Sequence, residues 1–161
     1  MVTHIGIGND FHRLCEGSGF WLGGVWIDCE LACIADSDGD VVLHALTDAL
    51  LGSCALGDIG ERYPHAKAGE PSNRFVLETM LLLAARHATV RNVDCIIELE
   101  RPKISQWKTA MRDTIADLLN ISSRNVSVKA KTREGMDAIG QGKAVAATVA
   151  LLVDINGNDN D

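Results

Sequence analysis

The clearest candidates for chemistry lie in the stretch Asp36-Ser-Asp-Gly-Asp-Val-Val-Leu-His44, which holds three carboxylates and one imidazole within nine residues. His44 falls where an apolar helix is expected to begin. Near the start of the chain, Asp10 and His12 form a second pair of the same residue types. Carboxylate and imidazole groups are common ligands of divalent transition metals. The two segments therefore predict a metal site assembled from distant parts of the chain, and they favour an enzyme over a binding module.

Asp10 and His12 are two residues apart on an extended segment, which points both side chains to one face. Together with His44 they make three protein ligands and leave a fourth zinc position open. Catalytic zinc sites have this arrangement, whereas structural sites are closed. An Asp-x-His pair is also common by chance, so the pair alone leaves a purely structural interpretation open.

The acidic run from Asp36 to Asp40 has other interpretations. It resembles the opening of a calcium loop, but the helix begins at once and no Glu stands at the twelfth position. Acids before a helix cap its N-terminus and oppose its dipole, which we expect of Asp40. Asp48, four residues after His44, is either an acceptor for the imidazole or a surface acid. Asp58, between two glycines, either binds substrate hydroxyls or belongs to a turn.

A phosphate-binding segment is indicated by Lys129–Glu134, which ends a strand and reads Lys-Ala-Lys-Thr-Arg-Glu. A glycine-containing loop, 135–142, follows it. Basic side chains, a threonine hydroxyl and backbone N–H groups suit phosphate oxygens, and Glu134 suits a magnesium ion carried by those phosphates. Pro102-Lys103 begins another loop after a strand. For each lysine alone, a solvated surface position is the competing interpretation.

The composition is that of a globular domain. The 161 residues are 47% apolar, and the formal net charge is −7. This charge disfavours nucleic acid as a partner, because such binding needs clustered Lys and Arg. Bound cations would have to offset any phosphate ligand. No apolar run is long enough to span a bilayer, so no membrane association is expected. No signal or transit peptide is seen, and we expect a cytoplasmic, bacterial-like protein.

The cysteines agree with a reducing compartment. There are five, an odd number, and none forms a Cys-x-x-Cys pair. Cys29 and Cys33 are either weak metal ligands or small buried side chains, and the second interpretation is favoured.

Hydrophobic periodicity predicts an α+β domain with a mixed β-sheet covered by helices on one face. The expected order is strand, hairpin, two helices, strand, helix and two strands. Ser72 and Ser105 are expected to cap the second and third helices. We expect one compact domain over residues 1–155 and a disordered tail over 156–161. The expected elements cover residues 3–8, 19–27 (the hairpin), 41–51, 75–87, 93–99, 107–118, 126–131 and 144–153.

Five segments of the chain resemble the 2-C-methyl-D-erythritol 2,4-cyclodiphosphate synthase family of the non-mevalonate isoprenoid pathway. The resemblance covers about residues 4–153. The second segment is long and very specific. The five are Ile5-Gly-x-Gly-x-Asp10-x-His12-Arg13-Leu14, Ser37-Asp-Gly-Asp-Val-x-Leu-His44-Ala-Leu-Thr-Asp48-Ala-Leu-Leu-Gly52, Leu56-Gly-Asp58-Ile-Gly60, Pro102-Lys103-Ile104 and Val128-Lys-Ala-x-Thr132-x-Glu134.

The resemblance implies a role for each matching residue. Asp10, His12 and His44 match the family's zinc ligands. Glu134 matches the residue that helps place Mg²⁺ or Mn²⁺ between the diphosphate groups, and Asp58 the carboxylate that binds the methylerythritol hydroxyls. The implied catalytic residues are Asp58, Lys103, Thr132 and Glu134. The implied substrate-binding residues are Asp36, Ser37, Asp38, Asp58, Ile59, Gly60, Lys103, Ala130, Lys131, Thr132 and Gln141, with Lys103 and 130–132 on the cytidine-diphosphate side.

The implied reaction is an intramolecular phosphoryl transfer. The 2-phosphate of 4-diphosphocytidyl-2-C-methyl-D-erythritol 2-phosphate attacks the β-phosphorus of its cytidine diphosphate, so that CMP leaves and a cyclic diphosphate forms. This nucleophile is already an anion. The enzyme must mainly neutralise charge and align two phosphates, which two metal ions can do. The resemblance also implies a homotrimer with active sites between subunits.

Three positions depart from the family pattern. Asp36 stands where the family has His, His65 where it has Asp, and Gln141 where it has Arg. The first departure adds a negative charge near an anionic substrate, and the third removes a positive one. They leave an alternative function open, in which the protein is a catalytically weak relative that binds a phosphometabolite or acts as a regulatory trimer.

Overall fold

A mixed five-stranded sheet forms the centre of the molecule in the computed structural model, which describes residues 1–64, 67 and 69–156. His65 and residues 157–161 of the expected tail therefore lie outside the described residues. The strand order is β4-β1-β7-β5-β6, and every neighbouring pair is antiparallel except β5 and β6, which are parallel. The strands are β1 (Val2–Glu16), β4 (Leu31–Ile34), β5 (Ala88–Glu98), β6 (Val126–Lys131) and β7 (Ala144–Ile155), with a separate hairpin of β2 (Phe20–Leu22) and β3 (Val25–Ile27).

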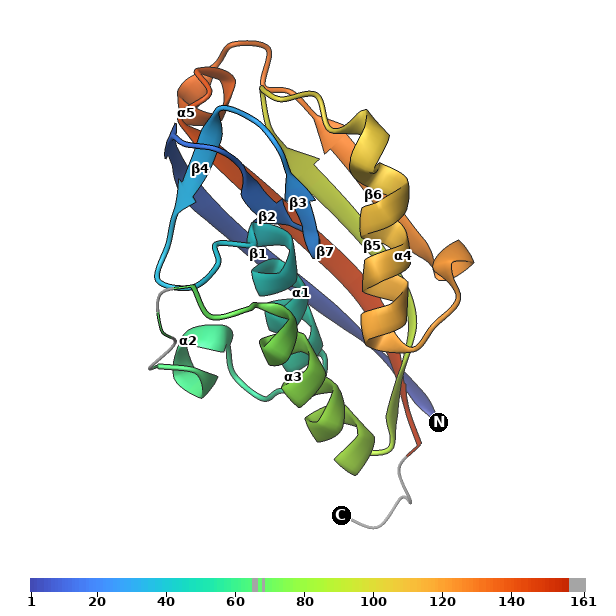
Figure 1. Ribbon diagram of the computed structural model, residues 1–161. Helices are drawn as coiled ribbons and strands as arrows, with labels where there is room; N and C mark the ends of the chain where they lie inside the picture. The colour runs from blue at the N-terminus through green and yellow to red at the C-terminus, as the bar shows by residue number, and fades with distance from the viewer. Residues whose placement is uncertain (65–66, 68, 157–161) are drawn as a thin grey trace.

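Three helices cover one face of this sheet, α1 (Val41–Ser53), α3 (Asn73–Ala85) and α4 (Lys108–Leu119) (Figure 1). The expected fold class, a mixed sheet with helices on one face, is confirmed. The described residues also form two single-turn helices, α2 (Ile59–Arg62) and α5 (Asp137–Gly140), and two 3-10 turns, Ser105–Trp107 and Ser123–Asn125. In the part of the chain that the structure describes, no helix is long and apolar enough to span a membrane.

Helix α1 lies unusually close to strand β1, and two glycines make this possible. A Cβ atom added to Gly6 would lie 1.9 Å from the carbonyl oxygen of Ala49, and one added to Gly8 would lie 1.9 Å from that of Ala45. Any side chain at these positions would overlap the helix backbone. The alternation of Gly6 and Gly8 along β1 therefore sets the distance between the strand and the part of α1 that holds Ala45 and Ala49.

The opposite face of β1 is apolar and bare. Ile5 and Ile7 alternate with the glycines and are each 63% exposed, and Phe11, further along the same face, is 69% exposed. Leu152 of β7, which pairs with Ile5 in the sheet, is 39% exposed. Contiguous exposed apolar side chains of this kind are typical of a surface that another protein chain covers.

The expected elements are mostly present, with several corrections. β1 runs to Glu16 rather than ending at residue 8, because it pairs with β7 as far as Arg13 and with β4 from Arg13 to Glu16. Strand β4 and the two single-turn helices were not predicted. Ser105 does not cap α4, because residues 105–107 form a 3-10 turn and Trp107 takes the capping position. Ser72 does precede α3, but its hydroxyl makes no capping hydrogen bond. The domain limits of 1–155 stay a prediction.

Candidate metal centre and active site

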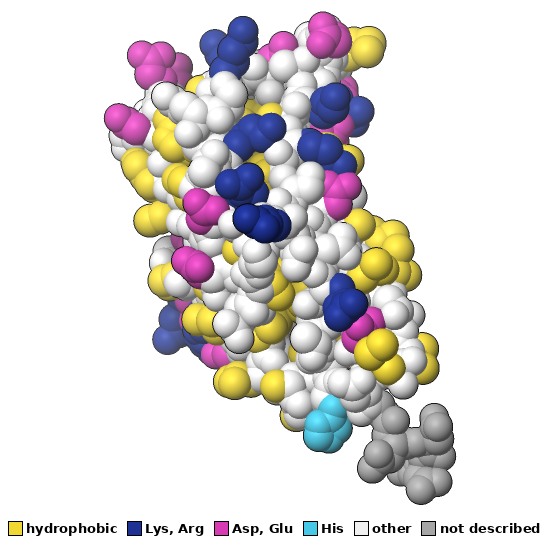
Figure 2. All heavy atoms as spheres, turned by 90° about the vertical axis from the view of Figure 1, so that its right-hand side faces the viewer, with side chains coloured by type: hydrophobic (Ala, Val, Ile, Leu, Met, Phe, Trp, Pro, Cys, Tyr) yellow, Lys and Arg dark blue, Asp and Glu magenta, His cyan; other side chains and the backbone are white. Residues whose placement is uncertain are grey.

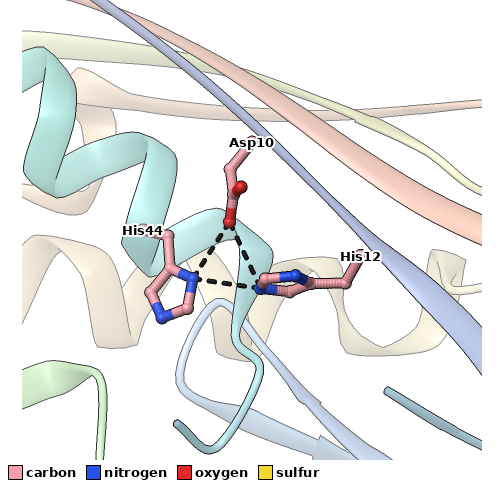
Figure 3. Close-up of side chains that lie close together, drawn as sticks. All are labelled: Asp10, His12 and His44. Atoms are coloured by element: carbon pink, nitrogen blue, oxygen red, sulfur yellow. Dashed lines mark hydrogen bonds and ion pairs between the residues drawn. The ribbon is translucent and has the colours of Figure 1, made fainter. Parts of the chain in front are cut away.

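Asp10, His12 and His44 come together where β1 passes beneath the first turn of α1. Asp10 and His12 continue the face of β1 that begins with Gly6 and Gly8, so their side chains point toward the helix. His44 projects from the first turn of α1 toward them (Figure 3). The glycine-dependent approach of the helix to the strand thus brings the three side chains into contact.

The three ligand atoms converge closely. Nδ1 of His44 lies 2.9 Å from Oδ2 of Asp10 and 3.1 Å from Nε2 of His12. Nε2 of His12 lies 3.3 Å from the same carboxylate oxygen. The two imidazole rings are nearly perpendicular, at 88°, with centroids 5.1 Å apart. The lines that join these atoms in Figure 3 form a small triangle, with one atom from each residue.

Burial favours the neutral, metal-binding form of His12. The pKa of His12 is lowered from 6.5, chiefly because burial disfavours the imidazolium ion, while Asp10 acts in the opposite direction and His44 lowers it further. A neutral imidazole has a lone pair on one ring nitrogen, which a metal ion can accept.

The donor set fits a divalent metal ion. One carboxylate oxygen and two imidazole nitrogens all lie within 4.8 Å of one another. Atoms that carry lone pairs repel one another at such distances unless a cation or a proton lies between them. Two nitrogens and one oxygen suit zinc and related transition metals better than magnesium.

The other ring nitrogen of His44 lies within hydrogen-bond distance of two serine hydroxyls. Nε2 lies 3.0 Å from Oγ of Ser37 and 2.8 Å from Oγ of Ser72, the residue just before α3. The hydroxyl of Ser72 donates to Oδ1 of Asp38, and its backbone N–H donates to Oδ2 of Asp38 at 2.9 Å. Ser72 is fully buried. Sequence reasoning treated it only as a helix cap, and no local pattern marks it as a neighbour of His44.

Asp40 fixes the start of α1, as predicted. Its Oδ1 accepts hydrogen bonds from the N–H groups of Val42 and Leu43, both at 3.1 Å. The same carboxylate accepts from the N–H groups of Gly23 and Gly24 in the β2–β3 turn, at 2.8 and 2.6 Å. Burial raises the pKa of Asp40, and these N–H groups oppose the rise. One buried carboxylate therefore attaches the hairpin to the helix that carries His44.

Asp58, Ile59 and Gly60 lie at the beginning of α2. Asp58 caps this helix by accepting from the N–H of Glu61 at 2.9 Å, and its side chain remains exposed. Asp48 does not accept a hydrogen bond from His44. Its Oδ1 accepts instead from the N–H of Ile59 at 2.7 Å, which ties the loop of Asp58 to α1.

The expected nucleotide side lies beyond the ends of the parallel strands β5 and β6. The chain just after β5 lies against the end of β6, because the N–H of Leu99 donates to the carbonyl of Lys131 at 2.9 Å. Oγ1 of Thr132 donates to Oε1 of Glu134 at 2.7 Å, and Glu134 has a φ of 52°, in the left-handed region. Gln141 follows α5 and accepts from Lys143 at 2.9 Å. Lys103, Ala130 and Lys131, which the resemblance assigns with Thr132 to the cytidine-diphosphate side, are exposed.

The metal centre and this nucleotide side are separated within one chain. Asp10 is in register with Ala147 of β7, Ala147 with Ile97 of β5, and Ile97 with Ala130 of β6. Three strand spacings of roughly 4.8 Å place Asp10 about 14 Å from Ala130. Ala147 and Ile97 are fully buried, so core side chains fill the space between the two groups on this face.

The charge distribution differs from the overall acidity of the chain. Figure 2 shows Lys and Arg side chains gathered on the side of the molecule that carries α4 and β6. These two elements carry Lys108, Arg112, Lys129 and Lys131. Lys129 is paired with Asp94 and Arg112 with Asp113, whereas Lys108 and Lys131 add positive charge on this side of a protein whose net charge is −7. Asp36, by contrast, adds an exposed acid beside Ser37.

Comparison with known proteins agrees with this arrangement. The sequence pattern of the YgbB family matches residues 3–154. The chain belongs to the YgbB family. A 2-C-methyl-D-erythritol 2,4-cyclodiphosphate synthase from Treponema denticola is 43% identical over 151 residues, which cover 92% of this chain and 94% of the relative. The resemblance inferred from the five segments is therefore confirmed.

Solved structures give the same result. A CDP complex of IspF from Plasmodium falciparum has a TM-score of 0.87 and 30% identity, and the match covers 96% of this chain and 97% of that one. The bifunctional IspDF from Campylobacter jejuni has a TM-score of 0.91 and 31% identity, and the match covers 96% of this chain but 43% of that longer chain. The expected lyase activity is the one for which the curated relatives are named, and a purely binding or regulatory role is not favoured.

Proposed function

We propose that this protein converts 4-diphosphocytidyl-2-C-methyl-D-erythritol 2-phosphate into 2-C-methyl-D-erythritol 2,4-cyclodiphosphate and CMP. The observation that carries the proposal is the convergence of Asp10, His12 and His44 within 4.8 Å, in a chain 43% identical to a named synthase over 92% of its length. No strong general base is required, since the attacking phosphate is already an anion. The residues need only bind the two phosphate groups, align them and neutralise their charge.

The metal ions belong to this proposal. Asp10, His12 and His44 would hold one Zn²⁺ per chain, and Glu134 would contact Mg²⁺ or Mn²⁺ bound to the substrate diphosphate. When bound, such ions stabilise negative charge on phosphate oxygens. The lowered pKa of His12, caused by burial, keeps its imidazole neutral and ready to bind at neutral pH.

The chain's own polar groups would position the substrate. Asp58, exposed at the start of α2, would accept hydrogen bonds from the methylerythritol hydroxyls. Lys103 and the segment Ala130–Thr132 would bind the cytidine-diphosphate portion, in keeping with the basic side in Figure 2. Relatives of known structure include a CDP-bound form of IspF. Aligned groups on both sides of the two phosphates would lower the barrier mainly through orientation and charge neutralisation.

We also propose a homotrimer in which each site lies between two subunits. Two observations support it. The metal centre and the nucleotide side are about 14 Å apart across the sheet, from three strand spacings, with buried side chains between them. The bare face of β1, with Ile5, Ile7 and Phe11 at 63–69% exposed, is an apolar surface suited to burial against other copies. A cytoplasmic location, expected from the free cysteines, remains part of the proposal.

The decisive experiment measures CMP and cyclic diphosphate formed by purified protein, with and without added Zn²⁺ and Mg²⁺. We expect both products with metals present and neither after chelation. His44→Ala should lose zinc and activity. His87→Asn is the matched control, because His87 has a φ of 54°, which Asn tolerates, and it lies beyond α3. Full zinc content in folded His44→Ala protein would overturn the metal assignment, and substrate binding without turnover would favour the binding alternative.

Light scattering tests the oligomer separately. Ile7→Lys should convert a trimer into smaller species, because a lysine at that position would have to be buried. Leu81→Lys is the matched control, since Leu81 is 72% exposed on α3, away from the bare face of the sheet. A wild-type protein that is monomeric at micromolar concentration would contradict the proposed assembly.

A further inference from the structure

A chain of hydrogen bonds lies directly behind His44, on the side away from Asp10 and His12. Oγ of Ser72 is 2.8 Å from Nε2 of His44. Asp38 holds Ser72 through both carboxylate oxygens, one accepting from the hydroxyl and the other from the backbone N–H. Ser72 is 0% exposed, so water does not compete for these bonds. The three residues come from the loop before α1, from α1 itself and from the position before α3.

The direction of these hydrogen bonds follows from the groups involved. An ionised carboxylate only accepts, so the hydroxyl hydrogen of Ser72 points to Asp38. The same hydroxyl can then interact with His44 only as an acceptor. Nδ1 lies 2.9 Å from the carboxylate of Asp10 and 3.1 Å from Nε2 of His12, so a metal ion or a hydrogen must lie between these atoms. When a metal ion occupies that place, Nε2 of His44 carries the hydrogen, which Ser72 accepts, and Nδ1 directs its lone pair at the metal.

We propose that Ser72, oriented by Asp38, is a positioning residue that holds His44 in the Nε2–H tautomer and keeps its Nδ1 lone pair directed at the metal centre. The inference rests on the metal site of the proposed function and extends it to a residue outside the predicted set. It also gives Asp38 a specific task. Its carboxylate acts through Ser72, and it accepts in addition from the N–H of Asp40 at 3.1 Å.

Ser37 provides a matched comparison. Its Oγ also lies 3.0 Å from Nε2 of His44, but its further hydrogen bond is accepted from the N–H of Gly39 at 3.2 Å. No carboxylate fixes the direction of its hydroxyl hydrogen. Ser37 can therefore donate or accept, and it does not select a tautomer.

The first test uses zinc-loaded, ¹⁵N-labelled protein at pH 8, because without a metal the carboxylate of Asp10, 2.9 Å from Nδ1, would itself favour a hydrogen on that nitrogen. Exchange-edited ¹H–¹⁵N spectra report how fast the Nε2–H hydrogen of His44 exchanges with solvent. We expect slow exchange in the wild type and in Ser37→Ala, and fast exchange in Ser72→Ala. Asp38→Asn should also speed the exchange, because its neutral amide can donate to Ser72 and so turn the serine hydroxyl hydrogen toward Nε2 of His44. It serves as the second variant if Ser72→Ala does not fold.

The second test measures zinc affinity by competition with a chelator, on samples shown to be folded by circular dichroism. Loss of a residue that orients a metal ligand typically weakens binding roughly 10- to 100-fold. We expect this weakening in Ser72→Ala and less than about a threefold change in Ser37→Ala. Wild-type zinc affinity and slow exchange of the Nε2–H hydrogen in both Ser72→Ala and Asp38→Asn would overturn the inference. A wild-type protein that binds no zinc would instead overturn the metal assignment of the proposed function.

Discussion

Gly8→Ala should weaken zinc binding, although the substitution changes none of the metal ligands. The added Cβ would lie 1.9 Å from the carbonyl oxygen of Ala45 and 2.8 Å from the backbone nitrogen of Ala49. Both atoms belong to the helix backbone, so no side-chain rotation can relieve the overlap. To reach an ordinary contact of 3.4 Å, α1 would have to move away from β1 by about 1.5 Å.

That movement would carry His44 away from its partners. The contacts of His44 with Asp10 and His12 are 2.9 and 3.1 Å, and metal–ligand distances tolerate only about 0.2 Å of error. We expect zinc affinity to fall at least about 100-fold, since a displacement of about 1 Å can cost that much in a functional site. We also expect the free energy of unfolding to fall by about 3 kcal/mol, at the upper end of the usual cost of overpacking.

Chelator competition and urea denaturation measure the two effects. Gly52→Ala is the matched control, because Gly52 lies on α1 with no atom within 4 Å of an added Cβ. It should keep wild-type zinc affinity and raise stability by about 0.5–1 kcal/mol, the helix-propensity gain of alanine over glycine. A Gly8→Ala protein with unchanged zinc affinity and an unchanged urea midpoint would refute the argument that these glycines set the geometry of the centre.

Three further predictions concern protonation, thiol reactivity and charge. Burial lowers the pKa of His12 from 6.5. The neutral, buried imidazole therefore contributes fully to the stability of the fold above that pH, and this contribution is lost as the pH falls toward the lowered pKa. Zinc binding should weaken below about pH 6 for the same reason, and the urea midpoint of metal-free protein should fall over this range less in His12→Gln than in the wild type. Burial raises the pKa values of Cys33 and Cys95 to about 12, so iodoacetamide at pH 8 should label exposed Cys15 first, as peptide mass spectrometry would show; equal labelling of Cys95 would contradict its burial. Asp36→His should raise kcat/KM several-fold, because the exposed carboxylate near Ser37 repels an anionic substrate, and unchanged kinetics would mean that this position lies outside the site.

The metal ligands were predictable because their placement follows from short-range rules. Asp10 and His12 share a face because side chains on a strand alternate every two residues. Asp40 is a typical N-cap residue, which marks the start of the helix that carries His44. The apolar positions of the major elements likewise predicted the α+β fold class. In each case the informative residues lie within one element or at its end.

The corrections depend on contacts between distant segments. The full length of β1 is set by its pairing with β7 and, at its end, with β4, which no local pattern in β1 reveals. Ser72 looks like an ordinary helix cap from its neighbours, yet in the fold it lies against His44, 28 residues earlier in the chain. Helical spacing made Asp48 a candidate partner of His44. In the fold, the carboxylate of Asp48 instead accepts a hydrogen bond from the N–H of Ile59.

The separation of the metal centre from the nucleotide side has a genetic consequence for the proposed trimer. If each site takes its metal ligands from one subunit and Glu134 from the next, then a subunit defective in His44 and a subunit defective in Glu134 can complement each other. In a ring with head-to-tail contacts, random mixing of the two inactive chains would leave about one quarter of the sites with both parts intact. Two loss-of-function alleles would then support growth together where neither does alone, and the dose of each allele would set the flux through the reaction.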